Sequence, residues 1–258
     1  MTYDSGPGEP TAAGVALAPP PGTLLSGAAA RYLKAMWYLS AGDAPLTVGR
    51  VAERVGVSHA SASTSVKHLV DDGYADRGTD NHIVLGPAGE KEAIRLVRRH
   101  RLVETFLAVV LGLPWEDVHT EAENLEWVLS DDLVDRIAVL LGEPERNPHG
   151  DPIPSADGLF PELDDVPLAD LEPGAKVRIV RVSNRDPELL RYVADEGLGI
   201  GTVVTVESQD PFEGPLWVRS SRGRHALGQP VVAAISVVRV GSDRGKTPTM
   251  SLPDAANG

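Results

Sequence analysis

Histidine and carboxylate side chains recur at helical spacing near the middle of the chain, where they are suited to binding a metal ion. His100 and Glu104 are four residues apart and therefore share one face of a helix. His119, Glu123 and Glu126 follow at i, i+4 and i+7, which is again one helix face. Helical bundles bind divalent metals with imidazole and carboxylate ligands aligned in this way. A ligand set without sulfur favours Mn²⁺ or Fe²⁺, with Zn²⁺, Co²⁺ and Ni²⁺ able to compete.

Two other interpretations fit the same spacing. It is also typical of a solvated acidic face that carries two surface histidines. A metal-dependent enzyme is the third interpretation, but no nucleophile or general-base motif accompanies the cluster, so we expect no enzymatic activity. The chain has no cysteine, which excludes disulfides and thiolate ligands and agrees with a cytoplasmic protein.

A second group of residues has the pattern of a helix-turn-helix. Thr47 and Ser58 are good N-caps for two short helices separated by a tight turn. Two short strands around residues 79–81 then predict a β-hairpin wing. The second helix has hydroxyl side chains that suit base edges and phosphates, and basic side chains nearby suit phosphates. The predicted DNA-contacting residues are Arg50, Arg54, Ser58, His59, Ser61, Thr64 and Lys67. A three-helix core without any DNA is the alternative.

The remaining elements form the frame for these two groups. Apolar periodicity predicts helices over 28–39, 87–112, 115–129 and 130–141, and β-branched runs separated by glycine predict four or five strands over 177–240. The fold class is therefore mainly α with a small β part: an N-terminal winged helix-turn-helix, a helical dimerisation domain and a C-terminal SH3-like (FeoA-like) β-barrel. The expected divisions are a tail (1–24), the winged helix (25–90), the metal-binding and dimerisation domain (91–150), a Pro-rich linker (151–170), the SH3-like domain (171–241) and a second tail (242–258).

The chain has a net charge of −13, and a net negative charge argues against a nucleic-acid partner because phosphates are also negative. The acidity is local, however: residues 100–172 have 3 basic and 18 acidic side chains, whereas residues 25–99 have 10 and 8. A basic face on the winged helix is thus compatible with the composition. No apolar run approaches the roughly 20 residues that span a bilayer, and the first residues have no basic segment typical of a signal peptide, so we expect no membrane partner.

Taken together, these segments resemble the diphtheria toxin repressor (DtxR/MntR) family of metal-dependent transcriptional regulators. The resemblance runs from about Leu24 to Val240, and its most specific stretches are HRLVETFLAVVLGLPWEDVHTEA and ERNPHGDPIPS. It implies a homodimer that binds palindromic operator DNA when loaded with Fe²⁺ or Mn²⁺ and that represses genes of metal homeostasis. An interaction role, in which the SH3-like domain binds a Pro-rich segment such as residues 144–161, is a further alternative.

The resemblance also implies roles for individual residues. His100, Glu104 and His119 fall where the family has an ancillary metal site, to which the SH3-like domain contributes; Asp186 and Glu188 are its candidates here. Glu123 and Glu126 match two of the four ligands of the family's regulatory site.

The other two regulatory positions depart from the family pattern. Trp127 stands where histidine is usual, and Arg31 stands where Met or Asp is usual; neither side chain ligates a metal. Our hypothesis is that Arg31 bonds Glu123 and Glu126 in place of the cation, so that DNA binding becomes independent of metal at this site. The alternative is that Arg31 points into solvent.

Overall fold

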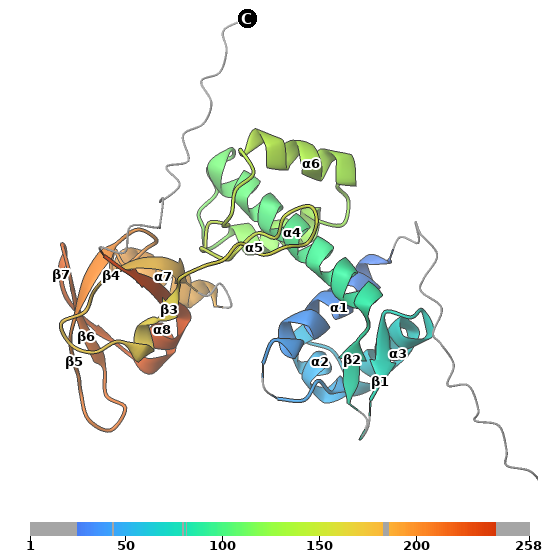
Figure 1. Ribbon diagram of the computed structural model, residues 1–258, viewed down its shortest axis with the longest axis horizontal. Helices are drawn as coiled ribbons and strands as arrows, with labels where there is room; N and C mark the ends of the chain where they lie inside the picture. The colour runs from blue at the N-terminus through green and yellow to red at the C-terminus, as the bar shows by residue number, and fades with distance from the viewer. Residues whose placement is uncertain (1–24, 43, 79, 81, 183–185, 241–258) are drawn as a thin grey trace, which may run out of the picture. The chain divides into compact units, whose positions relative to one another are not determined.

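The computed structural model describes residues 25–240 except 43, 79, 81 and 183–185. The chain divides into two compact units, and the boundary between them falls inside helix α4, between Leu96 and Val97 (Figure 1). The first unit contains α1 (Gly27–Ser40), α2 (Val48–Val55), α3 (His59–Asp71), β1 (Ala75–Arg77) and β2 (Ile83–Leu85).

Polar caps set the helix boundaries of the first unit. The side chains of Thr47 and Ser58 accept hydrogen bonds from the first turns of α2 and α3, as the sequence predicts. Gly56 ends α2 with a left-handed backbone (φ 75°), which glycine adopts without strain, and this turn separates the two helices of the helix-turn-helix. Apolar residues from all three helices, such as Leu33, Val51 and Val66, are fully buried and form the core.

The predicted wing is a two-stranded antiparallel ribbon. Strand β1 pairs with β2 in a register that places Ala75 opposite Leu85 and Arg77 opposite Ile83. The strand β2 is also tied to the loop before α2, because the Ile83 N–H donates to the Leu46 carbonyl at 2.9 Å. Of the predicted turn, residues 79 and 81 lie outside the described residues.

Three helices form the middle of the chain: α4 (Pro87–Val109), α5 (Val118–Leu125) and α6 (Asp131–Leu140). Leu102 of α4 packs against Val134 and Ile137 of α6, and a second cluster joins α4 to Val118 of α5. Helix α5 is shorter at both ends than the predicted 115–129. Glu126 C-caps it, and the residues that follow form turns.

The chain from 142 to 165 has neither helix nor strand, yet it is closely held. Arg98 and Arg101 of α4 donate to the carbonyls of Pro154 and Pro152. Arg146 forms a bidentate ion pair with Asp165, with N–O distances of 2.6 and 3.0 Å. Side chains of α4 and an ion pair within the segment therefore hold this irregular stretch in place.

A six-stranded antiparallel sheet forms the C-terminal part, in the order β3-β8-β4-β5-β6-β7. Its strands are β3 (Val166–Pro167), β4 (Lys176–Val182), β5 (Val203–Gln209), β6 (Leu216–Ser220), β7 (Gly223–Leu227) and β8 (Ile235–Arg239). Alternate residues of these strands are buried, which gives the core residues Val177, Ile179, Val204 and Val218. A short 3₁₀ turn, η2 (Leu168–Asp170), and the helices α7 (Pro187–Asp195) and α8 (Gln229–Ala234), which the strand pattern does not predict, complete this domain.

Candidate metal centre

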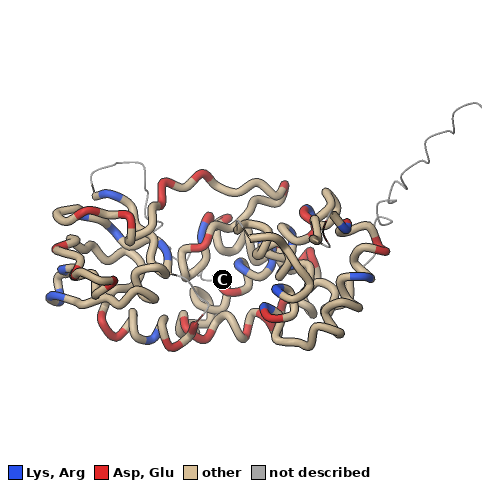
Figure 2. The backbone as a smooth tube through the Cα atoms, turned by 90° about the horizontal axis from the view of Figure 1, so that it is seen from below, with Lys and Arg blue, Asp and Glu red and all other residues tan. Residues whose placement is uncertain are grey.

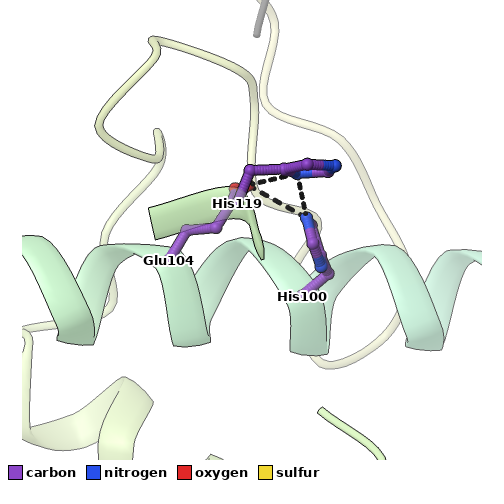
Figure 3. A group of neighbouring side chains, drawn as sticks. All are labelled: His100, Glu104 and His119. Carbon is purple, nitrogen blue, oxygen red and sulfur yellow. Dashed lines mark hydrogen bonds and ion pairs between the residues drawn. The ribbon is translucent and has the colours of Figure 1, made fainter. Parts of the chain in front are cut away.

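Three ligand-type side chains converge between α4 and α5, as Figure 3 shows: His100 and Glu104 from α4 and His119 from α5. His100 Nε2 lies 2.9 Å from Glu104 Oε1, and His119 Nδ1 lies 3.1 Å from the same oxygen. The two imidazole nitrogens are 3.0 Å apart. Within the described part of the chain, these residues form the grouping of His and carboxylate ligands whose donor atoms all fall within 4.8 Å of one another.

Local structure explains why the three side chains meet. Positions 100 and 104 share a face of α4, and the neighbouring apolar side chains Val103 and Leu107 pack against α5. That packing buries Val118 and Ala122 of α5. His119, which follows Val118, is therefore held close to His100 and Glu104. The convergence predicted from helical spacing is therefore present in the structure.

Burial makes this cluster electrostatically unusual. Glu104 is fully buried and His100 is 2% exposed, whereas His119 reaches the surface with 39% of its side chain. Burial raises the pKa of the Glu104 carboxyl, but the charges and hydrogen bonds of His100 and His119 outweigh burial, so its pKa lies well below the ordinary value. A buried carboxylate is stable when it is paired, hydrogen-bonded or bound to a metal, and this carboxylate between two imidazoles suits a divalent metal.

Two buried polar residues extend the cluster on opposite sides. Glu126, at the end of α5, accepts a hydrogen bond from His100 Nδ1 at 2.8 Å. Asn147, from the irregular segment, donates from Nδ2 to Glu104 Oε2 at 2.6 Å. Its Oδ1 accepts from the backbone N–H groups of His149 and Asp151, which fixes the orientation of the amide. Asn147 could not be identified from the sequence, because this residue lies outside any segment with helical or strand periodicity.

His149 is a second residue that sequence reasoning missed. Its ring is fully buried and stacks on Trp115, and Nε2–H donates to the Trp115 carbonyl at 2.7 Å. The proton is therefore on Nε2, and the lone pair of Nδ1 finds no hydrogen-bond partner in the described part of the chain. The backbone N–H of His149 donates to Asn147 Oδ1, and Asn147 in turn donates to Glu104, which places His149 beside the cluster in the hydrogen-bond network. An N/O donor set with an orphaned imidazole nitrogen fits a divalent transition metal.

Most other acidic side chains of the described residues are at least partly exposed, although that of Asp165 is only 8% exposed in its pair with Arg146. Across the described residues, Glu104 and Glu126 are the buried carboxylates, and both contact His100. Figure 2 marks the positions of Asp and Glu along the backbone in red. The excess of negative charge in residues 100–172 is thus mainly solvated, with these two carboxylates as exceptions.

The other predicted ligands occupy different settings. Glu123 is 41% exposed, with Oε1 3.8 Å from His119 Nε2. Asp186 caps α7 by accepting hydrogen bonds from the N–H groups of Glu188 and Leu189, and Glu188 is exposed in the first turn of that helix. Trp127 is half-buried after α5, and Arg31 is an exposed residue of α1. The structure does not include Asp186 or Glu188 in the grouping around His100.

The predicted DNA-contacting residues lie on α2 and α3. Arg50 donates to the carbonyls of Ala44 and Pro45, and the Arg54 guanidinium lies 4.7 Å from the centre of the Tyr38 ring. Lys67 pairs with Asp71 of its own helix at 2.5 Å. All the predicted residues of α3 and its cap are exposed, as are Ala60, His68 and Asp71; the predicted ones are Ser58, His59, Ser61, Thr64 and Lys67. The short side chains leave the α3 backbone accessible, while the basic groups of α2 are held by their own unit.

Comparisons with known proteins match the three parts of the chain. Residues 25–83 match the model of the iron dependent repressor N-terminal DNA binding domain, 87–155 its metal binding and dimerisation domain, and 166–239 the FeoA domain. The iron-dependent repressor IdeR of Mycobacterium tuberculosis is 35% identical over 190 residues, which are 69% of this chain and 82% of the relative. The diphtheria toxin repressor of Corynebacterium glutamicum is 33% identical over 68% of this chain and 81% of its own length.

Solved structures give the same relationship. A manganese-dependent transcriptional repressor in complex with manganese superposes with a TM-score of 0.76 and 39% identity, covering 82% of this chain and all of the other. ScaR with bound Cd²⁺ has a TM-score of 0.72 and 28% identity, covering 82% of this chain and 99% of its own. In the described residues, no helix combines the length and apolar character needed to cross a membrane.

Proposed function

The chain belongs to the iron-dependent repressor family, and from that premise we propose that it is a metal-responsive homodimeric repressor that binds palindromic operator DNA of metal-homeostasis genes. One observation carries the proposal: the carboxyl group of Glu104 is buried between two imidazoles in the same chain as an exposed helix-turn-helix. Its relatives are iron- or manganese-dependent repressors. The protein is not an enzyme.

His100, Glu104 and His119 would hold the metal. Their nitrogen and oxygen donors support Mn²⁺ or Fe²⁺. A bound cation supplies positive charge to the buried carboxylate and links α4 to α5. Glu123, Asp186 and Glu188 remain predicted ligands. To reach the metal, their side chains would have to move from the positions described above.

Coupling to DNA would run through α4. This single helix begins at Pro87, directly after the wing, and carries His100 and Glu104 roughly four and five turns later. Fixing α5 on α4 favours one arrangement of the dimerisation helices over others, which is a population shift toward the state that binds DNA.

Apolar side chains exposed near the metal centre support a homodimer. They lie at the end of α4 and on or before α6: Val110, Leu111, Val128, Leu133, Val139 and Leu140. Exposed apolar groups of this kind are typical of interfaces between subunits. Two subunits would place their α3 helices in successive major grooves, about one helical turn of DNA apart, and a cytoplasmic location follows from a DNA partner.

The test is operator binding with the metal controlled. An operator is first selected from random DNA, and its affinity is measured in Mn²⁺, Fe²⁺ and chelator for the wild type and for His119→Ala. We expect metal to strengthen wild-type binding and to have little effect on the variant. Equal affinity of the wild type in metal and chelator would contradict metal control by this cluster. A wild type that selects no DNA would contradict the repressor function altogether.

Arg31 and Trp127 favour a second candidate, a family member with an altered switch. Arg31 is exposed on α1 and Trp127 cannot ligate metal, so two of four regulatory ligands are missing. In this alternative, Arg31 forms charge-assisted bonds with Glu123 and Glu126 and makes DNA binding independent of metal at that position. Operator titration in chelator separates the two: Arg31→Ala weakens metal-free binding only if the bridge exists.

A further inference from the structure

The carboxyl group of Glu126 is buried and bonded to a metal-type histidine. It is 1% exposed, and Oε2 lies 2.8 Å from His100 Nδ1, a nitrogen that is itself buried. The two residues are 26 positions apart, and Glu126 ends α5 whereas His100 lies on α4, so the contact depends on tertiary packing. A buried polar group in such a place requires a hydrogen-bond partner, and the ring of His100 provides one.

The contact fixes which nitrogen of His100 is offered to the cluster. A carboxylate only accepts hydrogen bonds, so Nδ1 must carry a proton and donate it to Glu126. The opposite nitrogen, Nε2, faces Glu104 Oε1 at 2.9 Å and His119 Nδ1 at 3.0 Å. A metal held by this cluster would take the lone pair of Nε2, and Nδ1–H would stay bonded to Glu126.

Glu126 is held in this position by its backbone as well. Its N–H donates to the Ala122 carbonyl at 2.9 Å and closes α5. Its carbonyl accepts from Arg99 Nη1 at 2.9 Å, and the same nitrogen bonds the Leu129 carbonyl at 2.6 Å. Arg99 is the buried neighbour of His100 on α4, so one helix anchors both ends of the contact.

Glu123, one turn earlier on α5, offers a matched comparison. It has the same charge and also faces an imidazole of the cluster, but at 3.8 Å and with 41% of its side chain exposed. Water screens such a pair, and the distance is too long for a hydrogen bond. The two glutamates therefore differ in geometry rather than in charge.

We propose that Glu126 is a positioning residue of the His100–Glu104–His119 metal site, acting through the His100 ring instead of ligating a second ion. The inference rests on the proposed metal site, but not on DNA binding. Outer carboxylates of this kind set the tautomer and basicity of the ligand, and their loss typically costs about 10–100-fold in metal affinity. The site would then hold one metal per subunit with Glu126 in its outer shell.

The experiment measures metal stoichiometry and affinity of the full-length protein by competition with a chelating dye, using Mn²⁺ and Zn²⁺. We expect Glu126→Gln, which keeps the shape, to bind the same number of ions about 10-fold more weakly. Glu121→Gln, which removes an exposed carboxylate on the same helix, should change affinity by less than about 3-fold, as expected of a screened charge. Apo-state thermal unfolding of both variants checks that they fold.

Long-range ¹H–¹⁵N NMR of the Zn²⁺-loaded wild type adds a readout that needs no variant. The expected pattern is a protonated, strongly hydrogen-bonded Nδ1 and a metal-bound Nε2 on His100, and Glu126→Gln should speed exchange of the Nδ1 proton.

Three results would overturn the inference: loss of one whole metal equivalent in Glu126→Gln, unchanged affinity and spectrum in that variant, or metal on Nδ1 in the wild type. A wild type that binds metal at this site without any effect on operator affinity would refute the proposed function and leave this inference standing.

Discussion

Asn147 ties the irregular segment to the metal centre, and its removal tests how much the segment contributes. The side chain is 6% exposed and forms three hydrogen bonds. The bond from Nδ2 to the Glu104 carboxylate is 2.6 Å long and charge-assisted, which is worth about 1.5–3 kcal/mol. The two bonds that Oδ1 accepts, from His149 N–H at 3.1 Å and Asp151 N–H at 2.7 Å, are worth about 0.5–1.5 kcal/mol each.

These contributions predict that Asn147→Ala lowers the free energy of local opening by about 3 kcal/mol, since water entering the vacated space recovers part of the sum. Because the expected change is local, the assay is native-state hydrogen exchange, which reports on the opening of this segment itself. Peptides spanning residues 143–155 of the metal-free protein should exchange about 100-fold faster, with the amides of His149 and Asp151 most affected.

Ser155→Ala is the matched control for this experiment. Ser155 Oγ accepts from the Leu159 N–H at 3.2 Å, in the same segment but exposed to water. Its removal should cost about 0.5 kcal/mol or less. If Asn147→Ala and Ser155→Ala accelerate exchange to the same small extent, the amide does not anchor the segment and the reasoning is wrong.

Four further predictions concern the metal, the pH response, DNA and the dimer. Mn²⁺ at 100 times its Kd should stabilise the wild type by about 2.7 kcal/mol in thermal unfolding, and His119→Ala should lose most of that gain; an equal gain in both would place the metal elsewhere. Glu104→Gln should destabilise the apo protein by about 3–5 kcal/mol at neutral pH. Because folding lowers the pKa of Glu104, its contribution is present above the unfolded pKa and is lost as pH falls below about 4.5 toward the folded pKa, so urea unfolding of wild type and variant should converge in acid and not in base. Lys67→Ala should lower the slope of log affinity against log salt by about 1 in operator titrations, and an unchanged slope would remove Lys67 from the phosphate contacts. Val139→Asp should shift the monomer–dimer equilibrium toward monomer in sedimentation, since this valine is 72% exposed on α6; an unaltered dimer would move the interface away from that helix.

Elements with local signals were predictable from the sequence. Thr47 and Ser58 cap the helices that they were predicted to cap, because a hydroxyl just before a helix can accept a hydrogen bond from the N–H groups of the first turn. The family resemblance is confirmed by the comparisons. Helix α7 was missed among strand patterns, although Asp186 and Pro187 are a good N-cap and first-turn pair.

The metal centre was predictable only in part, for a physical reason. His100 and Glu104 share a helix face, and His119 follows on the next helix, so periodicity is enough to bring them together. Asn147 bonds Glu104 across 43 residues from a segment without periodicity, and no spacing rule reports that contact. For Glu126 the sequence indicates a carboxylate near the metal, but only the packing of the turn after α5 shows that it faces His100 Nδ1.

The same irregular segment connects the metal centre to the β domain. Asn147 holds Glu104, and two residues later the His149 carbonyl accepts from the Val182 N–H of β4 at 2.9 Å. Gly150 makes this approach possible: its φ is 85°, and an added Cβ would lie 1.9 Å from the Val180 carbonyl oxygen. Glu104 is therefore connected to β4 through Asn147 and the backbone of His149. Because the segment packs directly against β4, this strand helps to hold Asn147 in position. A larger residue at position 150 would push the segment away from the strand and should weaken metal binding, although it contacts no ligand.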